Sequence, residues 1–272
     1  MNIKTIGAVS AALLLLSAPA LAQVAPPPSS WQQFGALSSA GLSGQANTGA
    51  VINGNVGSNT AISNFPPSRV LPGSAVFPVA DPVVGQALID ANTAYNFLAL
   101  QGPGTVLPDN LATVGGPLTS GIYSTTTGAA DLPTGTVLTL NGPGIFVFNV
   151  ASLTANVLSS IAGTANPCNV YWRVGSSATL NGNNFRGTVI ALASVTIGDI
   201  VGPLVGTNLQ GRAVGLTAAV TMAGDGGTTV GGCSAALGVA GEGIPTLSEW
   251  ALILLATLMA GAGITAMRKR KS

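Results

Sequence analysis

Apolar and polar residues alternate with a period of two in short runs between residues 137 and 222. In five of these runs a threonine stands between two apolar neighbours, and the five threonines are 15 to 25 residues apart. Turn residues such as Asn141-Gly142 follow most runs. Alternation of this kind predicts short β-strands with one buried face. Strands that recur at such intervals favour a β-solenoid, an all-β fold of stacked coils, and a β-sandwich is the alternative.

The alternation also predicts which side chains face outward. Successive side chains of a strand point to opposite faces, so the apolar neighbours face the core and the threonines face solvent. The residue two positions before each threonine shares its outward face, and in every run except that of Val137 this residue is serine or alanine. If the coils stack, the outward residues form columns with a spacing of about 4.8 Å. The predicted flat, uncharged face comprises Thr139, Ser152, Thr154, Ser177, Thr179, Ser194, Thr196, Ala219 and Thr221.

One segment, residues 82–101, has the pattern of a helix. Asp81 and Pro82 are typical of an N-cap and a first helical residue, and 102–104 (Gly-Pro-Gly) ends the pattern. An apolar stripe runs along one side and predicts that the helix packs on a flat apolar surface. The stripe comprises Val84, Leu88, Ala91, Tyr95 and Leu98.

The two ends of the chain are typical of targeting segments. Residues 1–22 combine a basic start, a short apolar run and the cleavage pattern Ala20-Leu21-Ala22, which predicts a signal peptide for export. Residues 250–267 are uncharged and predict a transmembrane helix of about 27 Å. The basic residues of 268–272 then predict a cytoplasmic tail.

Composition suggests a domain plan for the rest. A proline- and serine-rich linker and the start of the fold occupy 23–39, one β-helix domain occupies 40–233, and a second linker with the motif described below occupies 234–249.

Charge and composition exclude several functions. The chain has no histidine, two cysteines and only 6% charged residues, so no histidine-based catalysis or zinc site is expected. Away from the ends there are four arginines against eight carboxylates, a net charge of −4, which disfavours nucleic-acid binding. The six aspartates are scattered along the chain. We therefore expect no enzyme, no metal and no cofactor.

The chain has two cysteines, Cys168 and Cys233, and it is predicted to be exported to an oxidising compartment. A disulfide between them is expected. The alternative is one buried and one exposed free thiol.

Several blocks of the sequence occur in a recognisable order, among them 47–57, the helix segment 90–96, 144–150 and the distinctive block 168–180. Together they are similar to the microbial ice-binding-like family of secreted β-helix proteins, and the likeness runs from about residue 40 to 233. The resemblance implies a right-handed, discontinuous β-helix with a long helix along one side, in which coils need not stack in chain order. It also implies adsorption to ice through the nine outward residues given above.

A short motif precedes the apolar and basic segments near the C-terminus and comprises Ile244, Pro245, Thr246, Leu247, Ser248, Glu249 and Trp250. Together with those segments it resembles the IPTL-CTERM type of bacterial sorting signal. The resemblance implies a Gram-negative cell-surface protein that a membrane sorting enzyme recognises. Two functions follow as hypotheses: an ice-binding surface protein, or a structural or adhesive surface protein without ice activity.

Overall fold

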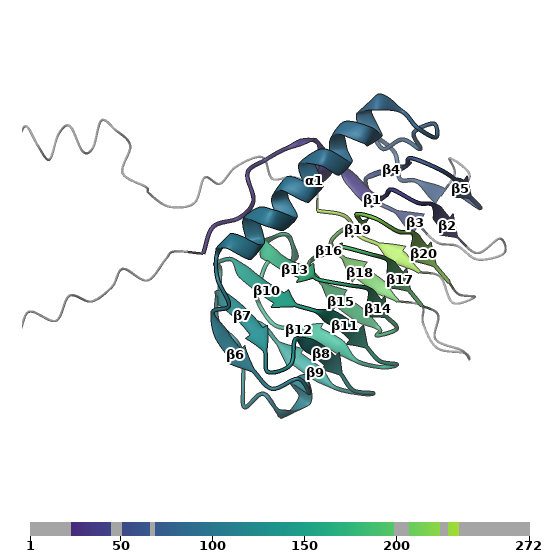
Figure 1. Cartoon of the computed structure of the whole chain (residues 1–272). Helices are drawn as coiled ribbons and strands as arrows, with labels where there is room; N and C mark the ends of the chain where they lie inside the picture. The colour runs from purple at the N-terminus through teal and green to yellow at the C-terminus, as the bar shows by residue number, and fades with distance from the viewer. Residues whose placement is uncertain (1–22, 45–50, 66–68, 199–206, 224–227, 234–272) are drawn as a thin grey trace, which may run out of the picture.

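The computed structural model describes residues 23–44, 51–65, 69–198, 207–223 and 228–233. Within these residues the chain forms a parallel β-solenoid of three sheets with one long helix along its side (Figure 1). This architecture confirms the predicted fold class. The predicted signal peptide, transmembrane helix and sorting motif lie outside the described residues. No helix among the described residues is long and apolar enough to cross a membrane.

The three sheets are named A, B and C here, and the chain visits them in that order in each coil. Within each sheet the strands are given in the order in which they lie side by side. Sheet A contains β4 (Asn55–Ser58), β1 (Phe34–Ser38), β19 (Ala213–Gly215), β16 (Thr188–Ala191), β13 (Val170–Val174), β10 (Phe146–Val150), β7 (Gly121–Thr125) and β6 (Thr105–Leu107). Sheet B contains β5 (Ile62–Ser63), β2 (Leu42–Gly44), β20 (Val220–Met222), β17 (Val195–Ile197), β14 (Ala178–Leu180), β11 (Ser152–Ala155) and β8 (Ala129–Leu132). Sheet C contains β3 (Val51–Ile52), β21 (Thr229–Val230), β18 (Asn208–Gln210), β15 (Asn184–Arg186), β12 (Ser160–Ala162) and β9 (Val137–Thr139).

The stack does not follow chain order. The first coil, β1 to β3, pairs with the last one, β19 to β21, as in the registers Ala36↔Ala213 and Leu42↔Val220. After β5 the helix carries the chain to the other end of the stack, where β6 and β7 start the remaining coils (Figure 1). The solenoid is therefore discontinuous, as the family resemblance implied. The first strand begins at Phe34, within the segment assigned to the linker and start of the fold.

Helix α1 (Pro82–Leu100) agrees with the predicted segment. The Asp81 carboxylate accepts a hydrogen bond of 2.8 Å from the backbone N–H of Val83, which caps the helix. All five residues of the predicted stripe are buried. They pack on the outer face of sheet A, against Leu37, Val147, Tyr171, Ile190 and Val214. Sheet A is thus covered on both faces.

The interior of the solenoid contains a ladder of aromatic rings. Tyr123, Phe148 and Trp172 come from successive strands of sheet A, and Phe185 comes from sheet C of the same coil as Trp172. Neighbouring ring centroids in this series are 5.2, 3.9 and 5.2 Å apart. Trp172 is fully buried, and its indole N–H donates to the Arg186 carbonyl over 3.0 Å. The stacked rings fill the core with large rigid groups, which favours a stiff scaffold.

Three short 3-10 helices complete the described elements: η1 (Ser30–Gln33), η3 (Leu111–Thr113) and η4 (Pro167–Asn169). A disulfide joins Cys168 in η4 to Cys233, with the two Cα atoms 5.3 Å apart, which confirms the predicted pairing.

Candidate functional site

The outer face of sheet B contains a column of hydroxyl-bearing side chains, here called the threonine column. It is formed by Thr154, Thr179, Thr196 and Thr221, which are direct partners in the register of four adjacent strands. Each of them lies between two buried neighbours and is itself partly exposed. Ser43 and Ser63 continue the column on the N-terminal coils.

A second column of small residues lies beside the first, two positions earlier in each strand. Extended by one residue, the strand registers align Ser152 with Ser177, Ser194 and Ala219, and the backbone carbonyls of the last three accept hydrogen bonds from the adjacent strands. We call this the small-residue column. The hydroxyls of Ser177 and Ser194 are hydrogen-bonded to each other over 2.9 Å. Together the two columns form a grid with spacings of about 4.8 Å across the strands and about 6.7 Å along them.

Backbone and corner contacts hold this face in place. The strands of sheet B pair in parallel through continuous registers. At the corner between sheets A and B, the Ser176 hydroxyl donates to the Ala151 carbonyl over 2.7 Å, and the Thr217 hydroxyl donates to the Leu192 carbonyl over 2.6 Å. The side chains of the face are short and β-branched or small, so they lose little conformational freedom when they bind a partner.

Three hydroxyls of the threonine column are available to water. Among the described residues, Thr154, Thr179 and Thr196 form no side-chain hydrogen bond, whereas Thr221 accepts a long one of 3.5 Å from Ser43. Hydroxyls about 4.8 Å apart are too distant to bond directly, but one water bridging two bonds of about 2.8 Å can span them. The column is therefore suited to hold a row of water molecules.

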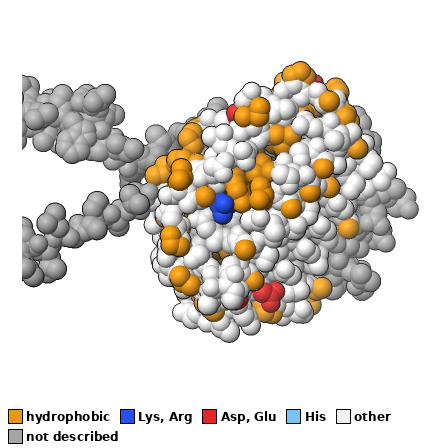
Figure 2. All heavy atoms as spheres, in the orientation of Figure 1, with side chains coloured by type: hydrophobic (Ala, Val, Ile, Leu, Met, Phe, Trp, Pro, Cys, Tyr) orange, Lys and Arg blue, Asp and Glu red, His pale blue; other side chains and the backbone are white. Residues whose placement is uncertain are grey.

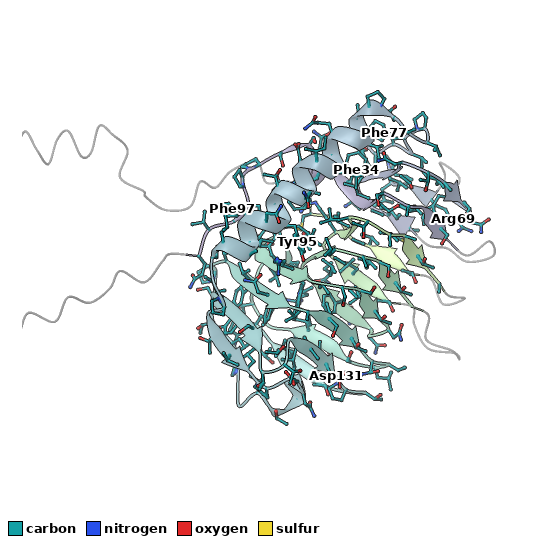
Figure 3. All side chains as sticks on the ribbon, viewed as in Figure 1. Phe34, Arg69, Phe77, Tyr95, Phe97 and Asp131 are labelled. Carbon is teal, nitrogen blue, oxygen red and sulfur yellow. A yellow bond between two sulfur atoms is a disulfide. The ribbon has the colours of Figure 1, made fainter. Side chains whose placement is uncertain are left out.

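Charge on this face is confined to one end. Asp131 on β8 occupies the position next to Thr154, and its carboxylate accepts a hydrogen bond of 2.8 Å from Asn156. It is the single charged residue on the described strands of sheet B. Asp131 and Arg69 lie at opposite ends of the stack (Figure 3). Charged side chains are sparse on the part of the surface seen in Figure 2 as well.

The outer face of sheet C has a different chemistry. Its side chains include Asn184, Asn208 and Thr229, which bond to one another: Asn208 donates to Asn184 over 3.3 Å, and Thr229 donates to Asn208 over 2.9 Å. Arg186 also projects from this sheet and donates to the Gly163 carbonyl over 2.6 Å. These longer, mutually bonded side chains leave fewer groups free for water.

Eight of the nine predicted site residues come together on sheet B, but Thr139 does not. It ends β9 in sheet C, where it pairs with Ala162. The sequence run around Thr139 has the same alternation as the others, but it forms the third side of its coil. The sheet B side of that coil is β8, in which Asp131 takes the outward position.

The sequence pattern missed Ser43 at the other end of the column. Its strand has glycine, Gly44, at the second inward position, so the apolar-polar-apolar signal is absent. A Cβ at Gly44 would lie 2.8 Å from the ring of Phe65, which fills this place in the core instead. A strand pattern that allows glycine at an inward position next to a core aromatic residue includes Ser43.

The geometry defines a class: a discontinuous three-sided β-helix with a helix covering one side. The chain belongs to the ice-binding-like family, whose model matches residues 36–228. This family is non-catalytic, in agreement with the expectation that the chain is not an enzyme. A second model, the IPTL-CTERM motif, matches residues 243–269.

Individual relatives agree with this assignment. The chain is 38% identical over 200 residues to an ice-binding protein of Nostoc sp. (strain HG1), which covers 70% of this chain and 68% of the relative. It is similar in structure to an ice-binding protein of the ascomycete Antarctomyces psychrotrophicus, with a TM-score of 0.58, 28% identity, and coverage of 75% of this chain and 96% of the other. For an ice-binding protein domain of Shewanella frigidimarina the TM-score is 0.61, with 26% identity and coverage of 76% and 96%.

Proposed function

We propose that this protein binds ice through the outer face of sheet B. Family membership and the names of its relatives support ice as the partner. The observation that carries the choice of face is the register that aligns Thr154, Thr179, Thr196 and Thr221 in one column. The face comprises this column and the small-residue column, Ser152, Ser177, Ser194 and Ala219.

The other two sides of the solenoid are less suitable. Helix α1 covers sheet A, so its outer face is closed to a crystal surface. Sheet C carries a guanidinium and amide side chains of unequal length that bond to one another. Sheet B alone combines short side chains, free hydroxyls and little charge over its described strands.

The mechanism is adsorption through ordered water. Each threonine offers a hydroxyl that anchors a water molecule and a methyl group that does not. Because the strands are held in register, the anchored waters take up a regular spacing before the protein meets ice. These waters then join the crystal lattice, and the adsorbed protein blocks further growth at that place. A charged side chain would bind water too strongly and in the wrong orientation.

Two lysine substitutions test the choice of face. Thr196→Lys places a long cation in the middle of the threonine column, and Thr139→Lys places the same side chain on sheet C. Both threonines are partly exposed and lie between buried neighbours, so the substitutions are matched. Thermal hysteresis and inhibition of ice recrystallisation are measured on residues 23–243. We expect Thr196→Lys to abolish most activity and Thr139→Lys to retain it, and the reverse order would place the site on sheet C.

We further propose that the protein is exported and retained at the cell surface. In this plan 1–22 is removed, 23–39 leads into the domain 40–233, 234–249 is a linker, 250–267 spans the inner membrane and 268–272 stays in the cytoplasm. The match to the IPTL-CTERM motif supports recognition by a membrane sorting enzyme. Fractionation of cells should find the full chain with the membrane or surface, and a chain ended after residue 243 in the soluble exported fraction.

The sorting motif also favours a second function, that of a structural or adhesive surface protein without ice activity. The assays above separate the two. Surface location together with no effect of the purified domain on ice growth would support the second function.

A further inference from the structure

We propose that the fold presents the sheet B face away from the membrane, because the C-terminal tether leaves the solenoid from the corner opposite sheet B. This inference rests on the proposed function, namely ice binding by sheet B and anchoring through residues 250–267. If it is correct, the protein does more than bind ice in solution. It attaches the membrane that carries it to a crystal on the outer side.

The path of the chain defines the corner. The last described strand, β21, belongs to sheet C, and Cys233 follows it after two residues. Its disulfide partner Cys168 lies in η4, on the connection from β12 in sheet C to β13 in sheet A. Both cysteines therefore lie at the corner between sheets C and A. In a coil of three sides, this corner is the one opposite sheet B.

Two kinds of bond fix the exit point there. The disulfide is covalent, and the backbone carbonyl of Cys233 accepts a hydrogen bond of 2.7 Å from Nη2 of Arg212. Arg212 is only 4% exposed, and its Nε donates to the Gln32 carbonyl over 2.8 Å. Release of Cys233 would thus leave part of a buried guanidinium without a partner, which is costly. The chain consequently starts its path to the membrane from a fixed place.

The N-terminal segment does not obstruct sheet B either. The backbone of Val24 exchanges two hydrogen bonds with the side chain of Gln101, at the end of helix α1, with distances of 3.1 and 2.8 Å. Helix α1 lies on sheet A, so this part of the chain runs on the side of the molecule away from sheet B. Neither described end of the chain crosses the candidate face.

The tether permits the domain to turn but favours one orientation. Sixteen residues separate Cys233 from the predicted span at 250, at most about 58 Å when fully extended. To bring sheet B against the membrane, this chain would have to pass along a whole side of the coil, about 17 Å for a five-residue strand. That path extends the tether and reduces its conformational freedom. The arrangement with sheet B outward requires no such extension.

The test measures the height of two positions above a bilayer, with the full mature chain reconstituted in phosphatidylcholine vesicles. No lysine occurs between residues 5 and 268, so a single introduced lysine can be labelled with an amine-reactive dye that does not cross the bilayer. Ala40→Lys places the dye at the exposed corner between sheets A and B. Asn169→Lys places it near the disulfide and removes one long hydrogen bond of 3.4 Å. The unsubstituted chain gives the background from the N-terminal amine.

We expect energy transfer to an acceptor lipid to be stronger from position 169 than from position 40, because a triangular coil with sides of about 17 Å gives a height difference of about 15 Å. Equal transfer, or stronger transfer from position 40, would overturn the inference even if the domain binds ice in solution. Failure of the chain to float with the vesicles would overturn the anchoring on which it depends. Vesicles carrying the full chain should also adsorb to growing ice, and those carrying Thr196→Lys should not.

Discussion

Replacement of Phe148 by alanine tests whether the aromatic ladder stabilises the solenoid. Phe148 is 1% exposed, and its ring lies between those of Tyr123 and Trp172, with centroid distances of 5.2 and 3.9 Å. Removal of a buried phenylalanine ring costs about 3–5 kcal/mol, from lost transfer energy and the cavity that remains. The two ring contacts are each worth about 0.5–1.5 kcal/mol, which places the expected loss at about 4–5 kcal/mol.

The expected loss is large enough to measure as a shift in Tm. For a domain of about 200 residues, 1 kcal/mol corresponds to about 2–4 °C, so Tm should fall by about 10–15 °C. Differential scanning calorimetry of residues 23–243 gives this value. Leu100→Ala is the control, because Leu100 is 84% exposed and its loss should change the stability by less than about 0.5 kcal/mol.

A fall of less than about 5 °C for Phe148→Ala would refute the reasoning, since it corresponds to only about 1–2 kcal/mol. That outcome would mean that the neighbouring coils collapse into the cavity and that the interior is less rigid than the stacked rings indicate. Phe148→Leu, which leaves a smaller cavity, should fall between the alanine variant and the parent protein.

Three further predictions concern the disulfide, the hydroxyls and pH. Loss of the disulfide, which closes 65 residues, should lower the stability by up to about 4 kcal/mol, seen as a lower Tm for the Cys168→Ser/Cys233→Ser variant; an unchanged Tm would contradict this. Thr179→Val with Thr196→Val should weaken thermal hysteresis while the stability changes by less than about 0.5 kcal/mol, because these hydroxyls form no hydrogen bond with the part of the chain that the structure describes; full activity would exclude a role for them. With no histidine, Tm should be flat from about pH 5 to 8 and fall below pH 4. Hydrogen bonds from Ser30 hold the pKa of Asp90 below its ordinary value, so its stabilising effect is lost as pH falls through that pKa, and Asp90→Asn should lessen the fall.

Local patterns predicted most of the elements. The N-cap, the apolar stripe and the terminating glycines gave the helix its correct bounds to within one residue. Alternation correctly placed the threonines of sheet B outward and their neighbours in the core. Both signals depend on residues close in sequence, so a single chain is sufficient to detect them.

The assignment of each strand to a side of the coil could not be predicted in this way. Thr139 and Thr196 have the same local pattern, but Thr139 lies on sheet C and Thr196 on sheet B. The difference depends on how many turns and strands precede each run within its coil. Ser43 joins the threonine column only because the first coil packs on the last, and Phe65 fills the space beside Gly44.

The sequence alone determined that hydroxyl-bearing side chains point outward and that the helix needs an apolar surface, because side-chain direction follows from the two-residue repeat of the strand and the turn of the helix. Only the tertiary structure decided which hydroxyls become neighbours and where Cys233 lies on the solenoid. Those relations join residues nearly two hundred positions apart, as in the pairing of Ser43 with Thr221, and they arise from the packing of whole coils and from the disulfide. The proposed ice-binding face depends on such lateral neighbours, so no single segment of the chain could form it.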